Sequence, residues 1–278
     1  MTLDAVDTTI PDDIAATHRA MWALGDYALM AEEVMAPLGP VLVAATGIGP
    51  GVRVLDVAAG SGNISLPAAK TGADVVSTDL TPELLRRSQA RAAAQGLLLD
   101  YREANAHALP FGDGEFDTVI SAIGVQFAPD HQRAADELIR VCRPGGMIGV
   151  ISWTPEGFFG RMLATLRPYR PSLSPAVAPA ALWGREGYVA GLLGDRVGRV
   201  TTLRGNLRVN RFDSAEAVHR YSRITTARRS RRTRTSATTG SWPPRSTPNS
   251  SNWRTSTWPT APCGGSTCWS PQRSSEKL

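Results

Sequence analysis

The sequence has few of the residues that build disulfide frameworks or metal sites. Its three cysteines, at positions 142, 263 and 268, are odd in number, and none has metal-site spacing to the histidines at positions 18, 107, 131 and 219. The first 17 residues lack the basic region and apolar run of a secretory signal and instead contain four aspartates. We therefore expect a cytoplasmic protein without a metal or a disulfide.

One stretch, residues 34–52, lacks charged side chains, as a membrane span would. Prolines and glycines that would break such a helix interrupt it: Pro37, Gly39, Pro40, Gly47, Gly49, Pro50 and Gly51. We therefore expect no membrane span and interpret this stretch as a helix end followed by a loop.

The last part of the chain lacks the apolar residue types that usually fill a protein core. Residues 226–277 contain no Ile, Leu, Val, Met, Phe or Tyr, while Ser and Thr supply 21 of the 53 residues from 226 to 278. Such a segment cannot bury enough apolar surface to offset its ordering entropy, so we expect a disordered basic tail over residues 226–278. Its Arg, Ser, Thr and Pro content, with four tryptophans, also resembles coding DNA read out of frame. If this hypothesis of an out-of-frame tail is correct, any activity of the protein could be impaired.

The basic charge is confined to that tail. It holds nine Lys or Arg and one acidic residue, so of the net +5 the tail carries +8, and residues 1–225, with 21 basic and 24 acidic residues, carry −3. A mildly acidic body argues against nucleic-acid binding by the folded domain. A nucleic-acid-associated protein acting through its Arg-rich tail remains an alternative.

The stretch 53–63 combines a buried strand with a turn of small residues. Residues 53–57 are mostly β-branched or leucine, as in a parallel strand, and Ala58, Gly60 and Gly62 then remove side chains from the turn. Backbone N–H groups and the following helix start can therefore approach a ligand closely. The pattern predicts a site for a nucleotide-like ligand.

The rest of the body alternates strands and helices. Further strands are predicted at residues 74–78, 97–103, 116–122 and 147–153, and an antiparallel hairpin over residues 197–212 turns at Gly205 and Asn206. Crossover-length connections between the strands predict an α/β fold with a doubly wound, mostly parallel sheet. Residues 1–45 read as an N-terminal helical lid region, and residues 46–225 as the main domain.

A dinucleotide site is one interpretation of the turn. Asp79 lies 17 residues beyond Gly62, near the spacing at which an acidic residue meets ribose hydroxyls. The turn lacks the third glycine of a dinucleotide fingerprint, because Asn63 stands at that position. An NAD(P)-dependent oxidoreductase is therefore retained as an alternative.

Four motifs in order carry a resemblance to a known family. They are D-V-A-A-G-S-G at residues 56–62, Asp79 after the second strand, N-A-H-A-L-P-F at 105–111 and R-P-G-G-M-I at 143–148. Over residues 20–222 the chain resembles class I S-adenosylmethionine-dependent methyltransferases, especially the ubiquinone and menaquinone biosynthesis branch. The resemblance implies a seven-stranded Rossmann-like sheet with a C-terminal antiparallel hairpin, and S-adenosylmethionine as the cofactor.

The resemblance also implies roles for individual residues. Asp79 would bind both ribose hydroxyls, and Asn105 stands where the family usually has an aspartate that meets the adenine amino group; its Oδ1 can accept the same hydrogen bond. Ser121, at the end of the fourth strand, would lie against the methionine arm. The implied cofactor-binding residues are Asp56, Ala58, Ala59, Gly60, Gly62, Asp79, Leu80, Asn105, Ala106 and Ser121.

The expected reaction is methyl transfer to a small-molecule acceptor by in-line displacement. Such a reaction needs alignment, exclusion of water and sometimes a general base. Residues near the strand ends that could act as the base, or as other catalytic groups, are Tyr27, His107, Gln126, Asp130 and His131; the sequence does not rank them. His18 and His219 are interpreted as surface or packing residues, and no pattern indicates an oligomeric state.

Overall fold

A computed structural model describes residues 12–169, 177–225 and 265–271. The strands are β1 (Arg53–Val57), β2 (Asp74–Asp79), β3 (Asp100–Glu103), β4 (Phe116–Ala122), β5 (Cys142–Ile151), β6 (Val197–Arg204) and β7 (Gly265–Pro271). The α-helices are α1 (Asp12–Leu24), α2 (Tyr27–Glu33), α3 (Leu38–Thr46), α4 (Ser65–Lys70), α5 (Pro82–Ala93), α6 (His131–Val141), α7 (Phe158–Leu166), α8 (Glu186–Leu193) and α9 (Ala215–Thr225). Short 3-10 turns are η1 (Val125–Phe127), η2 (Arg167–Tyr169), η3 (Ala180–Gly184) and η4 (Gly194–Arg196).

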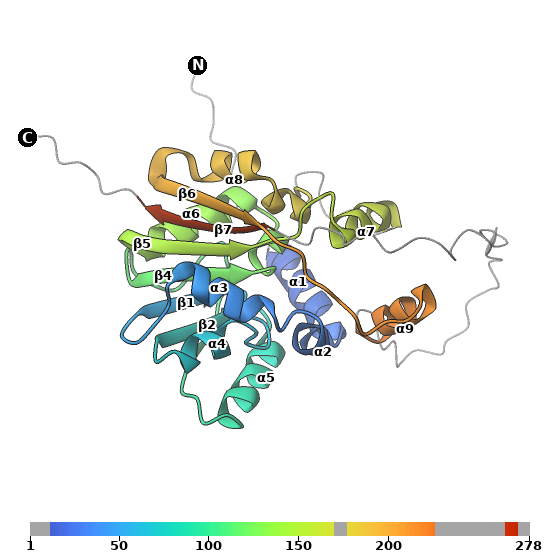
Figure 1. The fold of residues 1–278 in the computed structure, drawn as a ribbon. Coiled ribbons are helices and arrows are strands. Elements are labelled where there is room, and N and C mark those ends of the chain that lie inside the picture. The colour runs from blue at the N-terminus through green and yellow to red at the C-terminus, as the bar shows by residue number, and fades with distance from the viewer. Residues whose placement is uncertain (1–11, 170–176, 226–264, 272–278) are drawn as a thin grey trace, which may run out of the picture.

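Five parallel strands form the body of one sheet, in the order β3-β2-β1-β4-β5, and β7 and then β6 follow as antiparallel strands beyond β5 (Figure 1). The α/β fold and the mostly parallel sheet predicted from the strand and helix alternation are confirmed. The chain runs from β1 outward to the edge strand β3 and then crosses back over β2 and β1 to β4, so the carboxyl ends of β1 and β4 are adjacent. Ligands of open α/β sheets bind at such a switch in strand order.

Alternate residues of the central strands supply two separate cores, one on each face of the sheet. In β1, Leu55 and Val57 pack with residues of α6 and α8, whereas Val54 packs with residues of α3 and α4. Each fully buried aliphatic side chain contributes about 1.5–3 kcal/mol to the stability of the fold. Asp56 points to the same face as Val54, because side chains alternate along a strand. The burial pattern therefore confirms a doubly wound sheet and explains why β1 has apolar side chains on both faces.

The predicted hairpin over residues 197–212 is wrong in its second strand. Its first strand is β6, but residues 205–210 form no strand, and the antiparallel partner of β6 is β7. Leu207, Val209 and Phe212 line a cavity instead, so the alternation that suggested a strand reflects half-buried side chains that face this cavity. β7 lies inside the segment for which the sequence predicts disorder; residues 226–264 and 272–278 lie outside the described part of the chain.

The N-terminal helices confirm the interpretation of the charge-free stretch. Residues 38–46 form α3, whose Leu42 is fully buried, and Gly47 ends the helix in a left-handed conformation. In the described part of the chain, no single helix is long and apolar enough to cross a membrane. Helices α2 and α3 satisfy length and composition only as a pair, bent by 72° at the break between them.

Candidate active site

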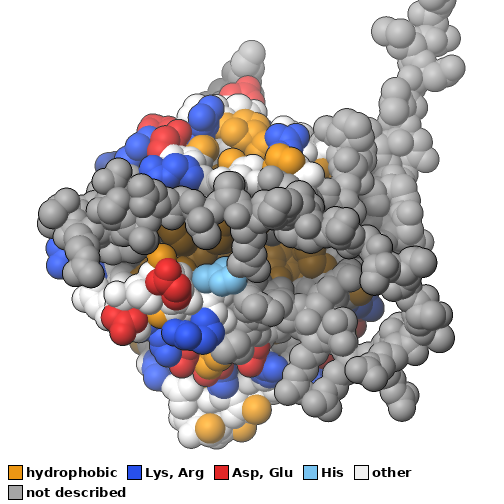
Figure 2. All heavy atoms as spheres, turned by 90° about the vertical axis from the view of Figure 1, so that its right-hand side faces the viewer, with side chains coloured by type: hydrophobic (Ala, Val, Ile, Leu, Met, Phe, Trp, Pro, Cys, Tyr) orange, Lys and Arg blue, Asp and Glu red, His pale blue; other side chains and the backbone are white. Residues whose placement is uncertain are grey.

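A large cavity opens at the carboxyl ends of the parallel strands. Its volume of about 2280 Å³ exceeds the roughly 300–1,000 Å³ typical of a single small-molecule site. The turn after β1 and the ends of β2 and β4 form its floor, while α1, α2, α7 and residues 206–222 form its walls. Figure 2 shows hydrophobic side chains deep in a hollow on this face, with charged side chains around it. The cavity has room for a cofactor and a second molecule side by side.

The turn after β1 presents backbone to the cavity. Gly60 has φ +58°, and a side chain there would point into open space, so a ligand can approach its backbone. At Gly62, whose φ is +82°, glycine is needed for a different reason. A Cβ there would lie 2.2 Å from the Ser88 Oγ of α5. Gly60 therefore faces a ligand, whereas Gly62, which does not line the cavity, allows α5 to pack against the turn.

Asp56 lies behind this turn and not in the cavity wall. Its Oδ2 accepts a hydrogen bond of 2.6 Å from Ser65 Oγ, and Ser65 Oγ lies 3.0 Å from Ser77 Oγ. Its Oδ1 has no hydrogen-bond partner among the described residues. Complete burial raises the pKa of Asp56 to about 7. Asp56 can therefore fix the turn from below, as a positioning residue.

Asp79, at the end of β2, lines the cavity and organises the turn. Its Oδ2 accepts a hydrogen bond from the Gly60 N–H, and its Oδ1 accepts one from the Thr81 N–H, both at 2.8 Å. Burial raises the pKa of Asp79, although these backbone hydrogen bonds act in the opposite direction. An ionised carboxylate has about four acceptor positions, so roughly two remain for a ligand's hydroxyls. Leu80 lines the cavity beside it.

The segment after β3 forms the next part of the wall. Asn105 and Ala106 both line the cavity. The Oδ1 of Asn105 accepts a hydrogen bond of 3.0 Å from the His107 N–H, which holds its amide in place. One acceptor position on that oxygen remains, so the side chain can still take a hydrogen bond from an amino group.

The residues that follow β1 and β4 meet in a strained crossing at the cavity floor. Ala58 and Ile123 have positive φ angles of 56° and 66°, which residues other than glycine rarely adopt. A Cβ at Gly124 would lie 2.4 Å from the Ala58 carbonyl oxygen. Strain of this kind costs on the order of 1–3 kcal/mol per residue and gathers at functional sites. This strain at Ile123 could not be predicted from the sequence, because β-branched residues favour extended backbone.

Ser121 is buried beneath this crossing and does not line the cavity. Its Oγ donates a hydrogen bond of 2.6 Å to the Val57 carbonyl of β1 and accepts one of 3.1 Å from the Val125 N–H. The serine therefore joins β4 to β1 and to η1. Any effect that it has on a ligand passes through the backbone of these elements.

The cavity brings together three of the predicted catalytic candidates, namely Tyr27, His107 and Gln126. His131 is buried outside it, where its Nε2 lies 3.1 Å from the Gln126 carbonyl oxygen and its Nδ1 lies 2.9 Å from Tyr188 Oη. Asp130 caps α6 by accepting a hydrogen bond of 3.0 Å from the Arg133 N–H. Asp130 and His131 are thus structural, whereas the other three can reach a ligand.

Two buried histidines of the cavity are held neutral. The His107 Nε2 accepts a hydrogen bond of 3.2 Å from the Asp130 N–H, so its proton is on Nδ1, which has no partner among the described residues. Burial lowers the pKa of His107 and of His18. The sequence interpretation of His18 as a surface or packing residue missed its place in the cavity wall, because α1 gives no pattern that distinguishes the two.

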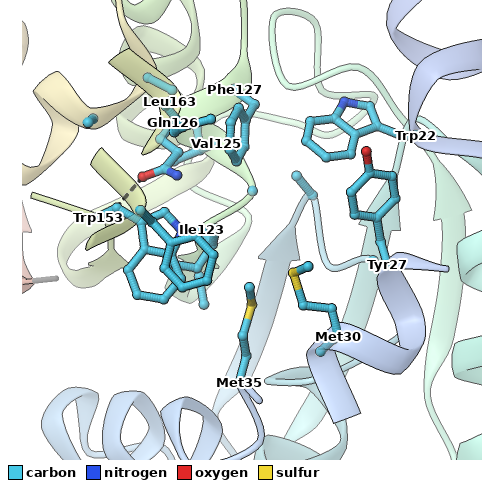
Figure 3. Close-up of a pocket in the computed structure, with 18 of the residues that line it drawn as sticks. Trp22, Tyr27, Met30, Met35, Ile123, Val125, Gln126, Phe127, Trp153 and Leu163 are labelled. Carbon is cyan, nitrogen blue, oxygen red and sulfur yellow. Dashed lines mark hydrogen bonds between the residues drawn. The ribbon is translucent and has the colours of Figure 1, made fainter. Parts of the chain in front are cut away.

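The part of the cavity wall that comes from α1, α2, η1 and α7 is apolar and aromatic (Figure 3). Trp22 lies edge-on to both Tyr27 and Phe127, with ring centroids 4.9 Å apart in each pair. Across the cavity, Trp153 stacks on Phe159 at 4.4 Å. In Figure 3, Met30 and Met35 lie below these two groups, and Ile123 is drawn beside Trp153. In the described part of the chain, no group of three or more His, Cys, Asp or Glu could hold a metal ion.

Three comparisons relate this arrangement to known proteins. Residues 55–150 match a family model described as a methyltransferase domain. The chain is 79% identical over 218 residues to an uncharacterised protein of Mycobacterium tuberculosis, a match that covers 78% of this chain and 80% of the relative. It is 41% identical over 112 residues to a demethylmenaquinone methyltransferase of Thermus thermophilus, covering 39% of this chain and 51% of that protein.

A crystal structure of an S-adenosylmethionine-dependent methyltransferase from Methanosarcina mazei has the same fold. Its TM-score is 0.53 at 16% identity, and the alignment covers 83% of this chain and 98% of that one. The residues of this cavity fit the cofactor: Gly60 leaves open space at the turn, Asp79 keeps free acceptor positions, and Asn105 can meet an amino group. The chain belongs to the class I S-adenosylmethionine-dependent methyltransferases, and S-adenosylmethionine is its cofactor.

Proposed function

We propose that the protein transfers a methyl group from S-adenosylmethionine to a small, apolar acceptor molecule by in-line displacement. The observation that carries this proposal is the continuity of one cavity, polar at the ends of β1 and β2 and aromatic toward α1, α2 and α7. The cofactor supplies the methyl group and the leaving group, so the protein has to align the two molecules and exclude water. A small-molecule acceptor also agrees with the name of the Thermus thermophilus relative.

We propose that the cofactor end acts through four features of the chain. Asp79 would accept hydrogen bonds from the ribose hydroxyls, and Asn105 Oδ1 from the adenine amino group, with Leu80 and Ala106 packing beside the base. Backbone groups of the turn at residues 58–60 would hold the amino-acid end. Asp56, Gly62 and Ser121 would act indirectly by fixing the turn and the β1–β4 crossing, because none of them lines the cavity. Water would be excluded by the aromatic walls.

The two rival functions are weaker. An NAD(P)-dependent oxidoreductase would need close packing of the helix after the turn, where Asn63 replaces the third glycine. Nucleic-acid binding through the Arg-rich tail rests on residues outside the described part of the chain. A cytoplasmic location stays a prediction from the sequence.

We also propose that residues 226–278 are an out-of-frame translation. The relative from Mycobacterium tuberculosis matches 78% of this chain, which leaves room for an unrelated end, and residues 226–277 contain no Ile, Leu, Val, Met, Phe or Tyr. In that case another reading frame would encode an apolar, helix-patterned continuation. Sequencing the gene tests this: an apolar continuation in another frame supports the proposal, and its absence contradicts it.

Calorimetric titration tests the proposed cofactor and reaction class. The full-length protein is titrated with S-adenosylhomocysteine and, separately, with NAD and NADP. We expect micromolar affinity for S-adenosylhomocysteine and no binding of either dinucleotide. Binding of a dinucleotide alone would contradict the proposed function and support the oxidoreductase.

A further inference from the structure

Gln126 is a buried side chain at the aromatic end of the cavity with one half of its amide unused. The residue has 0% exposure, and its Oε1 accepts a hydrogen bond of 3.0 Å from the Trp153 N–H. Its Nε2 has no hydrogen-bond partner among the described residues. In Figure 3 the oxygen of this amide is directed to Trp153, and the nitrogen lies on the other side. A buried amide donor without a partner is unfavourable unless a ligand supplies an acceptor.

The orientation of this amide is fixed by the chain. The Trp153 N–H can only donate, so the atom facing it has to be the oxygen, and Nε2 cannot exchange places with it. The backbone that carries Gln126 is also held, because its carbonyl oxygen pairs with His131 Nε2 and the neighbouring Val125 N–H donates to Ser121 Oγ. The cavity therefore presents a preorganised N–H donor at a set position.

Charges around the aromatic end further limit the ligand. Of the described residues that line the cavity, Asp79 is the only acidic one, and it belongs to the cofactor end. Arg167 and Arg208 also line the cavity, but both are exposed. A cationic amine at the aromatic end would thus lose its hydration without meeting a carboxylate, which is costly. An uncharged molecule loses much less, and apolar walls favour it.

From these observations we infer that Gln126 determines acceptor specificity: its Nε2 donates a hydrogen bond to an oxygen atom of an uncharged, aromatic acceptor. This inference rests on the proposed function, since it assigns a second molecule to the cavity beside the cofactor. His107 Nδ1–H, buried and unpartnered among the described residues, is a second donor in the same cavity. Both groups favour an acceptor that offers oxygen lone pairs and disfavour a charged amine.

Two naphthalene probes of similar size test the inference on the full-length protein saturated with S-adenosylhomocysteine. They are 2-naphthol, which offers an uncharged oxygen, and 2-naphthylmethylamine, which is an ammonium ion at neutral pH. Calorimetry of the wild type should give an affinity for 2-naphthol about tenfold or more above that for the amine. Equal or tighter binding of the amine, or no binding of 2-naphthol, would overturn the inference.

Two substitutions remove the donor in different ways. Gln126→Glu keeps an oxygen for the Trp153 N–H, whereas Gln126→Met removes both the Nε2 donor and the Oε1 acceptor of the Trp153 N–H without adding charge. Both should weaken 2-naphthol binding about tenfold and leave the affinity for S-adenosylhomocysteine unchanged. Gln95→Glu, at an exposed residue that follows α5, is the matched control and should bind both molecules as the wild type does.

The outcomes separate this inference from the function on which it rests. Unchanged 2-naphthol binding in Gln126→Met and Gln126→Glu would overturn the role of Gln126 while leaving methyl transfer intact. Failure of the wild type to bind S-adenosylhomocysteine would instead contradict the proposed function itself. If Gln126→Glu does not fold because of its buried charge, Gln126→Met alone decides the point.

Discussion

The two ends of the cavity are built in different ways. At the cofactor end, the turn after β1 and the Asp79 carboxylate meet through hydrogen bonds to backbone N–H groups, and the residues come from short, ordered motifs. At the aromatic end, the walls come from α1, α2, η1, α7 and residues 206–222, which are distant in sequence. Backbone geometry therefore defines the first end, whereas packing of side chains defines the second.

This difference predicts which substitutions separate cofactor binding from acceptor binding. Changes at the cofactor end should disturb a connected set of hydrogen bonds and should thus have large effects. Changes at the aromatic end remove apolar contact from one wall and should have smaller effects that leave the cofactor affinity intact.

The largest effect is expected for Asp79→Ala. The substitution leaves the N–H groups of Gly60 and Thr81 without their acceptor, at about 1–3 kcal/mol each, and removes the acceptor for a ligand's hydroxyls. Calorimetry should show affinity for S-adenosylhomocysteine at least about 100-fold below wild type. The affinity of Asp79→Asn, which keeps one acceptor oxygen, should lie between those of the wild type and Asp79→Ala. An affinity within a factor of two of wild type in Asp79→Ala would contradict the role of this carboxylate.

A matched pair of glycines separates stability from binding. Gly62→Ala forces a Cβ against Ser88 and Leu66, and overpacking of this kind lowers the free energy of unfolding by about 1–3 kcal/mol. In Gly60→Ala the new methyl group points into open space, so the cost in stability is only the backbone strain of about 1 kcal/mol. The methyl group enters the cavity, however, where it competes with a ligand for space.

Urea unfolding and cofactor titration of both variants check this pair. Gly60→Ala should lose more cofactor affinity, and Gly62→Ala should lose more stability. The opposite order would mean that the cofactor does not lie against Gly60.

At the aromatic end, Phe159→Leu removes the ring that stacks on Trp153. An aromatic pair contributes about 0.5–1.5 kcal/mol beyond its buried area, so binding of 2-naphthol should weaken roughly three- to tenfold. Affinity for S-adenosylhomocysteine, measured in the same titration series, should stay at the wild-type value. Equal losses for both ligands would remove the distinction between the two ends.

The smallest net effect is expected for pH, because buried groups act in opposite directions. Burial lowers the pKa values of His18, His107 and His131 below the ordinary 6.5, so their contribution to stability is present above that pH and is lost as pH falls. Asp56 has a raised pKa of about 7, above its ordinary 3.8, so its contribution is present at low pH and is lost as pH rises toward 7.

Asp56→Asn separates these contributions. We compare the free energy of unfolding of the wild type with that of the variant, both measured by urea unfolding. The wild-type value minus the variant value should be larger at pH 5 than at pH 8, by about 1 kcal/mol or more. The same difference at both pH values would show that the Asp56 carboxyl has an ordinary pKa in the folded protein.

The sequence predicted much of the cofactor end, because local motifs encode its backbone. β1, the glycine turn and Asp79 were all located from spacing, and the order of strands and helices followed from crossover lengths. Gly62 and Ser121 are predicted to contact the cofactor, but neither lines the cavity in the structure, where Gly62 packs against Ser88 and Ser121 bonds to Val57. A one-dimensional motif does not distinguish a residue that contacts a ligand from one that lets two elements pack.

The aromatic end could not be predicted in the same way. His18, Trp153 and Phe159 belong to segments whose apolar patterns fit any buried helix or strand end, and only the fold brings them together. The hairpin at residues 197–212 failed for a related reason. Leu207 alternates as a strand residue would, but it packs into the cavity instead.

A crystal structure of the protein with S-adenosylhomocysteine tests the central claim most directly. The ribose hydroxyls should lie within hydrogen-bond distance of the Asp79 carboxylate, and the sulfur should face the end of the cavity that holds Gln126 and Trp153. An adenosine group bound among Trp22, Trp153 and Phe159, with Asp79 left without a ligand, would contradict the division of the cavity into a cofactor end and an acceptor end.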